Sequence, residues 1–147
     1  TIDQILEGTG LDGSYLKLEL TESMLMQNRR QVIELLTEIR QRKIQVSIDD
    51  FGTGYSSLSY LHYLPIDTLK IDRSFVMRMS EMGENFEIVE AIITLAHHLE
   101  MDVVAEGVET EEQVYFLKQE GCDYGQGYFF SKPLMALDFR EYLTSYC

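Results

Sequence analysis

Acidic side chains recur in this sequence where β-prone segments end. These acids are Glu19, Asp49, Asp50 and Glu106. Adjacent carboxylates such as Asp49 and Asp50 repel one another, so both remain ionised at neutral pH only where a cation or strong hydrogen-bond donors compensate them. A hard divalent metal ion is a suitable compensator because it prefers oxygen ligands. The pattern therefore predicts a metal site shared by several strand ends.

Lys70 and Gln126 add two further polar side chains to this set. Lys70 lies within the short β-prone run 68–71, and Gln126 lies between two glycines. A lysine that points inward from a strand is costly to bury unless carboxylates surround it, and glycines let the backbone approach a ligand closely. Together these residues support phosphoester hydrolysis, in which carboxylates hold one or two metal ions, a metal-bound water attacks, and Lys70 orients or deprotonates that water.

Each acid also has a local explanation. An aspartate before a glycine-containing turn often binds the amides of that turn, and loops that begin at strand ends are polar in general. Acid followed by glycine at two strand ends, a further acid at a third, a lysine inside a strand and a glutamine between glycines together exceed what these explanations require. The shared metal site is therefore the preferred interpretation.

The elements that must position these side chains alternate along the chain. Strands are predicted at 15–21, 45–50, 68–71, 102–105 and 124–130, and helices at 29–42, 58–63, 84–99, 110–120 and 136–143. Strands separated by helices indicate a parallel sheet with right-handed crossovers. The carboxyl ends of the strands form the ligand face in such folds, in barrels and in open sheets alike. The predicted class is therefore α/β, with about five parallel strands, flanking helices and one polar face.

Two details refine the predicted helices. The segment Thr110-Glu111-Glu112-Gln113 has the form of a capping box. His97 and His98 close the longest predicted helix, where the helix dipole favours a cation. We therefore interpret these histidines as helix-end residues rather than as metal ligands.

The composition is typical of one globular domain. The chain has 147 residues, 45% of them hydrophobic, and no apolar run approaches the roughly 18 residues that a membrane helix needs. We expect a cytoplasmic location, because no secretory signal opens the chain and its two cysteines, Cys122 and Cys147, lack zinc or disulfide-scaffold spacing; a membrane anchor elsewhere in a parent protein is compatible with this. The net charge of −13 argues against long nucleic acid or an anionic membrane as a partner.

Several motifs resemble one known family. They lie at 18–23 (Leu-Glu-Leu-Thr-Glu-Ser), 49–58 (Asp-Asp-Phe-Gly-Thr-Gly-Tyr-Ser-Ser-Leu), 64–67 (Leu-Pro-Ile-Asp), 69–72 (Leu-Lys-Ile-Asp), 105–110 (Ala-Glu-Gly-Val-Glu-Thr) and 126–128 (Gln-Gly-Tyr). In this order and over nearly the whole chain, they closely resemble the EAL family of bacterial cyclic-di-GMP phosphodiesterases. The resemblance implies hydrolysis of one phosphodiester of cyclic-di-GMP, which yields linear pGpG in second-messenger signalling.

The resemblance also implies metal ligands. Glu19 and Asp49 match residues that bind metal, and Asp49 matches the one that bridges two Mg²⁺ or Mn²⁺ ions. Asp50 matches a ligand of the second ion. This chain is thus expected to supply part of a two-metal site.

Further roles follow from the same resemblance. Lys70 matches the residue that contacts the nucleophilic water, Glu106 the acid that holds metal-bound water, and Gln126 a residue on that water or on the substrate. Glu22 matches the glutamate that stabilises the loop 50–57, which the family uses for metal retention and dimer contact.

The sequence departs from the family in one respect. The Glu-Ala-Leu motif, whose glutamate is a metal ligand, is absent, and a second ligand, an asparagine, lies upstream of this chain in the family's order. An eight-stranded barrel typically needs about 250 residues. We therefore expect residues 1–147 to be a single incomplete EAL domain, a partial (β/α)8 TIM-like barrel that has little activity alone. Its open edges invite a homodimer, or completion by another chain or by the missing N-terminal part.

Two alternatives remain open. The chain could be a non-catalytic module that binds cyclic-di-GMP or a protein partner, which the missing ligands favour. It could also belong to a barrel enzyme of another activity that uses the same metal face. The retained acids, Lys70 and Gln126 favour an active parent domain.

Overall fold

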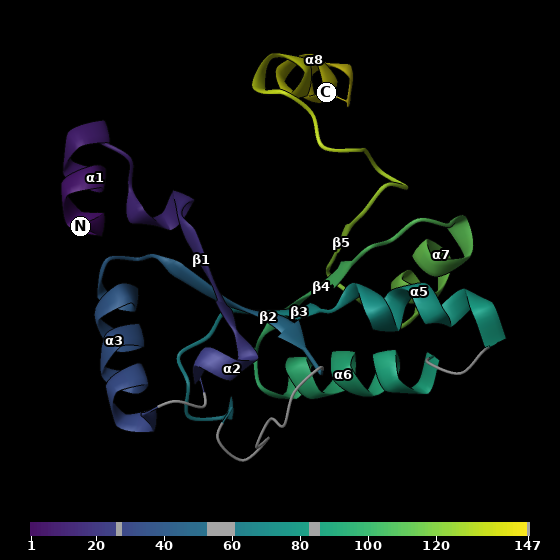
Figure 1. Ribbon diagram of the computed structural model, residues 1–147, viewed down its shortest axis with the longest axis horizontal. Coiled ribbons are helices and arrows are strands. Elements are labelled where there is room, and N and C mark those ends of the chain that lie inside the picture. Colours follow the sequence, from purple (N-terminus) through teal and green to yellow (C-terminus); the bar gives the residue numbers. More distant parts are fainter. Residues whose placement is uncertain (26–27, 53–60, 83–85, 147) are drawn as a thin grey trace.

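A single parallel sheet forms the centre of the computed structural model, which describes residues 1–25, 28–52, 61–82 and 86–146. Its strands are β1 (Lys17–Thr21), β2 (Gln45–Phe51), β3 (Thr68–Ile71), β4 (Asp102–Glu106) and β5 (Tyr124–Gln126). Their spatial order is the sequence order, β1-β2-β3-β4-β5, and every pair is parallel. The predicted α/β class with five parallel strands and flanking helices is confirmed (Figure 1).

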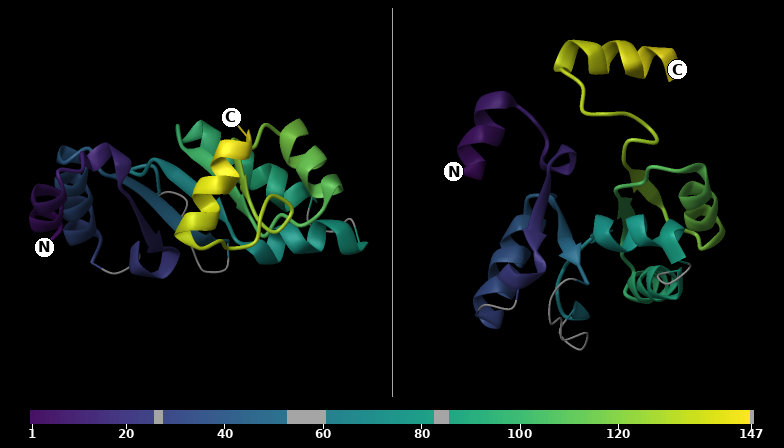
Figure 2. Two further views of the ribbon diagram at one scale, coloured as in Figure 1. Left: turned by 90° about the horizontal axis from the view of Figure 1, so that it is seen from above. Right: turned by 45° about the vertical axis from the view of Figure 1, so that its right-hand side comes forward.

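Helices connect the strands. They are α1 (Ile2–Thr9), α2 (Glu22–Leu25), α3 (Arg29–Gln41), α5 (Arg73–Met82), α6 (Phe86–His98), α7 (Glu111–Gln119) and α8 (Ala136–Tyr146), with a 3-10 turn at Gly13–Tyr15. In Figure 1, α2, α3 and α6 lie on one side of the strands, whereas α8 stands apart on the other; the right-hand view of Figure 2 shows the same separation. No helix within the described ranges is long and apolar enough to cross a membrane.

The core lies between the sheet and the helices that cover it. All four residues of β3, the central strand, are buried. In α6, residues Val89, Ile92, Ile93 and Ala96 form one buried face, as the helical spacing of the sequence predicts. Burial of such a side chain is worth roughly 1.5–3 kcal/mol, so the packing of α6 holds the strands that carry the candidate site.

The predicted capping box at the start of α7 is present. Gln113 N donates to Thr110 Oγ1 at 3.2 Å, and Thr110 N donates to Gln113 Oε1 at 3.0 Å. The amide of Gln113 also reaches another helix, since its Nε2 donates to Val76 O of α5 at 2.9 Å. One side chain therefore caps α7 and joins it to α5.

Helix α5 is absent from the sequence-based expectations. Asp72 caps it, because its Oδ1 accepts a hydrogen bond from Ser74 N at 3.0 Å. Val76 and Met79, three residues apart, are buried at 0% and 1% exposure. An aspartate followed by apolar residues at helical spacing is the signal that would have predicted this helix.

The last strand is shorter than predicted. It ends at Gln126 rather than at Phe130, so the prediction of a strand over 124–130 is wrong beyond Gln126. The chain turns there, and Phe130 N donates to Gly127 O at 3.1 Å. A Cβ atom on Gly127 would collide with the backbone of Val108, so a contact with a distant segment sets the turn. The short helix predicted at 58–63 lies largely outside the described residues.

Candidate active site

Lys70 lies at the centre of a cluster of charged side chains. Its side chain is 9% exposed, and its Nζ lies 2.6 Å from Glu106 Oε1, 3.0 Å from Asp49 Oδ1 and 3.0 Å from Glu19 Oε1. These carboxylates come from β4, β2 and β1. The parallel topology thus brings together four of the residues that the sequence singled out.

The environment of Lys70 raises the pKa of its ammonium. Burial by itself lowers this pKa, but the hydrogen bonds with Glu106, Asp49 and Glu19 outweigh burial and raise it above its ordinary value of 10.5. The side chain is therefore a cation that donates hydrogen bonds. Three carboxylates around one ammonium leave the cluster with a formal charge of −2, which favours the binding of further cations.

A β-bulge places two acids opposite this lysine. The register pairs Ile48 with Leu69 and then Phe51 with Ile71, so two residues of β2 oppose one residue of β3. Those two residues are Asp49 and Asp50, and the one is Lys70. Asp50 has a φ of 56°, a left-handed conformation that aspartate tolerates better than most residues. The bulge directs Asp49 into the cluster and leaves Asp50 exposed.

Asp49 carries an oxygen suited to a metal ion. Its Oδ1 is buried and, apart from the ion pair with Lys70, has no hydrogen-bond partner within the described ranges. Carboxylate oxygens are the donors that Mg²⁺ and Mn²⁺ prefer. However, no group of three or more His, Cys, Asp or Glu side chains in the described part of the chain is arranged to hold a metal. The donor chemistry fits a divalent cation, whereas the ligand set within these residues is incomplete.

Glu22 lies beside the glycine that follows the bulge. The glutamate is 3% exposed, and its Oε2 accepts a hydrogen bond from Gly52 N at 3.1 Å. Gly52 has a φ of 96°, and a Cβ atom there would lie 2.8 Å from the ring of Phe75. The contact holds the first part of the segment 50–57; residues 53–60 lie outside the described residues. It agrees with a loop-stabilising role for Glu22, which stays a prediction.

Gln126 lies beside the cluster, next to a pocket. It pairs with Glu106 across β4 and β5 and is exposed. Both residues line a cavity of about 340 Å³ together with Arg73 and Tyr128, a volume within the range of small-ligand sites. Sequence reasoning missed Arg73. A cation two residues beyond a strand end, at an edge rich in acids, is the signal that would have indicated it.

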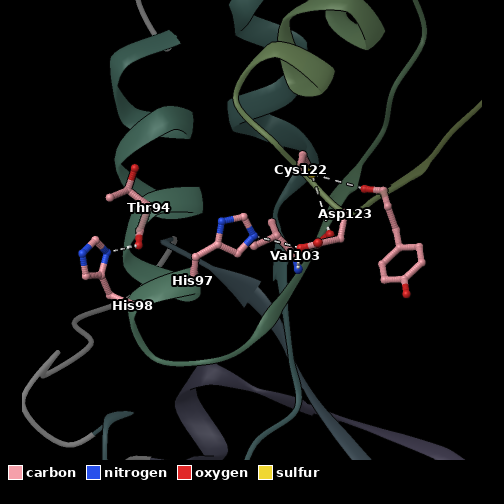
Figure 3. A network of polar contacts seen from close by, with 7 residues as sticks. Thr94, His97, His98, Val103, Cys122 and Asp123 are labelled. Atoms are coloured by element: carbon pink, nitrogen blue, oxygen red, sulfur yellow. Dashed lines mark hydrogen bonds and ion pairs between the residues drawn. The ribbon is translucent and has the colours of Figure 1, made fainter.

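The two histidines are helix-end residues, as predicted. His97 Nε2 lies 2.9 Å from Asp123 Oδ2, and His98 Nδ1 lies 2.7 Å from Thr94 O (Figure 3). Nearby, burial raises the pKa of Cys122 to about 11, so its thiol is a poor nucleophile.

Comparisons with known sequences identify one family. A family model described as EAL domain matches residues 1–133. Cyclic di-GMP phosphodiesterase NbdA of Pseudomonas aeruginosa is 50% identical over 141 residues, which are 96% of this chain and 18% of that protein. Oxygen sensor protein DosP of Escherichia coli is 40% identical over 144 residues, 98% of this chain and 18% of that protein. This chain therefore spans less than a fifth of these curated relatives.

Solved structures agree. The EAL domain of Mycobacterium smegmatis DcpA superposes with a TM-score of 0.91 at 42% identity, over 98% of this chain and 65% of that chain. The PaMucR phosphodiesterase in its c-di-GMP complex superposes with a TM-score of 0.90 at 40% identity, over 94% of this chain and 56% of that chain. Each of these structures thus contains a substantial length of chain beyond the part that matches.

Proposed function

Because the chain belongs to the EAL domain family, we propose that it forms part of a phosphodiesterase domain that hydrolyses cyclic di-GMP to linear pGpG in bacterial signalling. The carrying observation is the cluster in which the Lys70 ammonium contacts carboxylates from β1, β2 and β4. Two relatives support the substrate, since NbdA is named a cyclic di-GMP phosphodiesterase and PaMucR is in complex with c-di-GMP. The architecture is then part of a TIM-like barrel.

In this proposal the acids of β1 and β2 hold the metal. Glu19, Asp49 and Asp50 would bind Mg²⁺ or Mn²⁺ in a two-metal site, with further ligands from outside the described residues. Bound metal would activate water and neutralise charge on the phosphodiester. An anionic substrate needs this compensation, because the chain itself carries a net charge of −13.

The other side chains orient water and substrate. Lys70 donates a hydrogen bond to the attacking water, and Glu106, 2.6 Å from its Nζ, holds the ammonium in place and accepts a hydrogen bond from the same water. The amide of Gln126 binds the water or a phosphate oxygen. Arg73, in the adjoining pocket, offers a guanidinium to a phosphate.

A non-catalytic module is the second candidate. The observation that favours it is the lack of a three-ligand metal group within the described ranges. In that case the chain would bind cyclic di-GMP, or a protein partner, without cleaving it. For either function we propose a cytoplasmic location and a homodimer, or completion by another chain or by further sequence of the same protein.

A hydrolysis assay distinguishes the candidates. The full-length natural polypeptide, supplied with cyclic di-GMP and Mg²⁺ or Mn²⁺, is expected to produce pGpG, measured by chromatography. Lys70→Met should lower kcat about 100-fold or more, whereas Lys17→Met, at the other end of the sheet, should not. Binding without turnover would instead identify a regulatory module that binds cyclic di-GMP, and neither binding nor turnover would leave only a module that binds a protein partner.

The isolated segment provides a second test. Residues 1–147 alone are expected to show little turnover, because their metal site lacks ligands. Robust Mg²⁺-dependent hydrolysis by this segment would contradict the prediction that its metal site is incomplete.

A further inference from the structure

Two aspartates each accept a hydrogen bond from a neighbouring strand at the amino ends of the strands, the edge of the sheet opposite Lys70. We call each of these two contacts, Asp67 with Val46 and Asp123 with Val103, a clasp. Asp67 directly precedes β3, and its Oδ2 accepts a hydrogen bond from Val46 N of β2 at 2.8 Å. Asp123 directly precedes β5, and its Oδ2 accepts one from Val103 N of β4, also at 2.8 Å. In both cases the donor is the second residue of its strand. The same device therefore occurs twice in the sheet.

The first clasp lies three residues from a pair in the site. Three residues after Val46 comes Asp49, and three residues after Asp67 comes Lys70. The pairing of β2 with β3 is regular up to Ile48, before the bulge. The Asp49 and Lys70 side chains then meet at 3.0 Å. The hydrogen bond from Val46 to Asp67 thus lies at the start of the ladder whose end carries the ion pair.

The second clasp has the same spacing. Three residues after Val103 comes Glu106, and three residues after Asp123 comes Gln126. The pairing of β4 with β5 is regular throughout and ends with Glu106 opposite Gln126. In both clasps, therefore, the donor and the aspartate each lie three residues before a residue that the proposed function requires.

Burial alone does not fully determine the register of the two strands that follow the aspartates. A strand that alternates between buried and exposed residues has one favoured register, because a slip of one residue turns every side chain to the other face. All three residues of β5 are exposed, so burial does not select a register for this strand. In β3, Leu69 and Ile71 lie in the hydrophobic core whereas Lys70 contacts carboxylates, which disfavours a slip of one residue but not of two, because a slip of two keeps each side chain on its own face.

We propose that Asp67 and Asp123 are positioning residues, which fix the register of β3 on β2 and of β5 on β4. They thereby place Lys70 against Asp49 and Gln126 beside Glu106. The catalytic consequence rests on the proposed function, whereas the effect on register does not. Neither aspartate touches the cluster itself.

Further contacts hold each aspartate in position. Asp67 N donates to Val46 O at 2.9 Å, and Asp67 O accepts a hydrogen bond from Asp102 N at 3.0 Å, so this residue binds β2 and β4 as well. The Oδ2 of Asp123 also contacts His97 Nε2 at the end of α6, and Figure 3 shows the carboxylate between His97 and Val103. Burial tends to raise the pKa of Asp123, but hydrogen bonds from His97 and Val103 lower it below 3.8.

Substitutions that separate shape from charge test the proposal in the full-length natural polypeptide. Asn keeps an acceptor oxygen in the same place, whereas Glu keeps the charge but displaces the oxygen by one methylene. We expect Asp67→Glu and Asp123→Glu to lower kcat about tenfold with KM changed less than twofold, and the Asn variants to keep kcat within about threefold. The control is Asp102→Ala. Asp102 is an exposed aspartate at the same edge, and its carboxylate makes no hydrogen bond to the described residues.

Amide hydrogen exchange tests the register without reference to activity. The Val46 amide in Asp67→Glu and the Val103 amide in Asp123→Glu should exchange about tenfold faster, while amides of α6 stay protected. Glu variants as active as wild type, Asn variants as impaired as Glu, or unchanged exchange would overturn the proposal. A wild-type protein without turnover would refute the proposed function alone, since exchange still decides the role in register.

Discussion

The two edges of the sheet both carry charged clusters, but they satisfy their carboxylates differently. At the carboxyl edge, Glu19, Asp49 and Glu106 share one ammonium, and Asp49 Oδ1 is buried and has no hydrogen-bond partner besides that ammonium in the described part. At the amino edge, Asp123 Oδ2 receives a backbone amide and a histidine. An edge with unmet acceptor capacity is suited to bind cations and react, whereas a satisfied edge is suited to hold geometry.

The largest effect is expected from a substitution that breaks the charged cluster around Lys70. Lys70→Met leaves three carboxylates without their cation, so we expect the free energy of unfolding to fall by about 3 kcal/mol. Lys17→Met, which removes an exposed lysine that donates to Thr68 Oγ1, should cost less, about 1–2 kcal/mol. Urea unfolding measures both. Mg²⁺ should recover part of the loss in Lys70→Met, and equal losses in the two variants would contradict the comparison.

The next effect strains the loop beside the cluster. Gly52→Ala must adopt a φ of 96° and meet the ring of Phe75, so we expect a loss of about 2 kcal/mol in the free energy of unfolding. Gly8→Ala is a matched control, because Gly8 lies in α1 with nothing within 4 Å of an added Cβ. That substitution should stabilise by about 0.5–1 kcal/mol. The two substitutions are thus expected to change the free energy of unfolding in opposite directions. If thermal unfolding showed changes in the same direction, the role of the left-handed turn at Gly52 would be refuted.

The smallest effect concerns the satisfied edge and its dependence on pH. Because the folded-state pKa of Asp123 lies below its ordinary value of 3.8, its charged form stabilises the fold above about pH 4 and this contribution is lost as the pH falls through the lowered pKa. The difference in unfolding free energy between wild type and Asp123→Asn should therefore shrink as the pH falls below about 4. A difference that grew as the pH fell below about 4 would contradict the lowered pKa of Asp123.

Local patterns predicted most elements but not all their limits. Alternation of strands and helices predicted five parallel strands, and the apolar spacing from Val89 to Ala96 predicted α6. The extension of β5 beyond Gln126 was wrong, because the turn at Gly127 depends on its approach to Val108. Helix α5 was missed because its cap, Asp72, stands next to a strand motif.

The candidate site divides in the same way. The sequence by itself determined that the acids and Lys70 stand at or near the carboxyl ends of parallel strands, since that follows from the order of elements along the chain. The tertiary structure decided which of them meet. The bulge that sets two acids against Lys70, the pocket that includes Arg73 and the clasps of Asp67 and Asp123 all join residues about 20 or more positions apart. Register and close packing between segments depend on contacts between residues far apart in the sequence. Local propensity does not determine these contacts, so only the folded chain shows them.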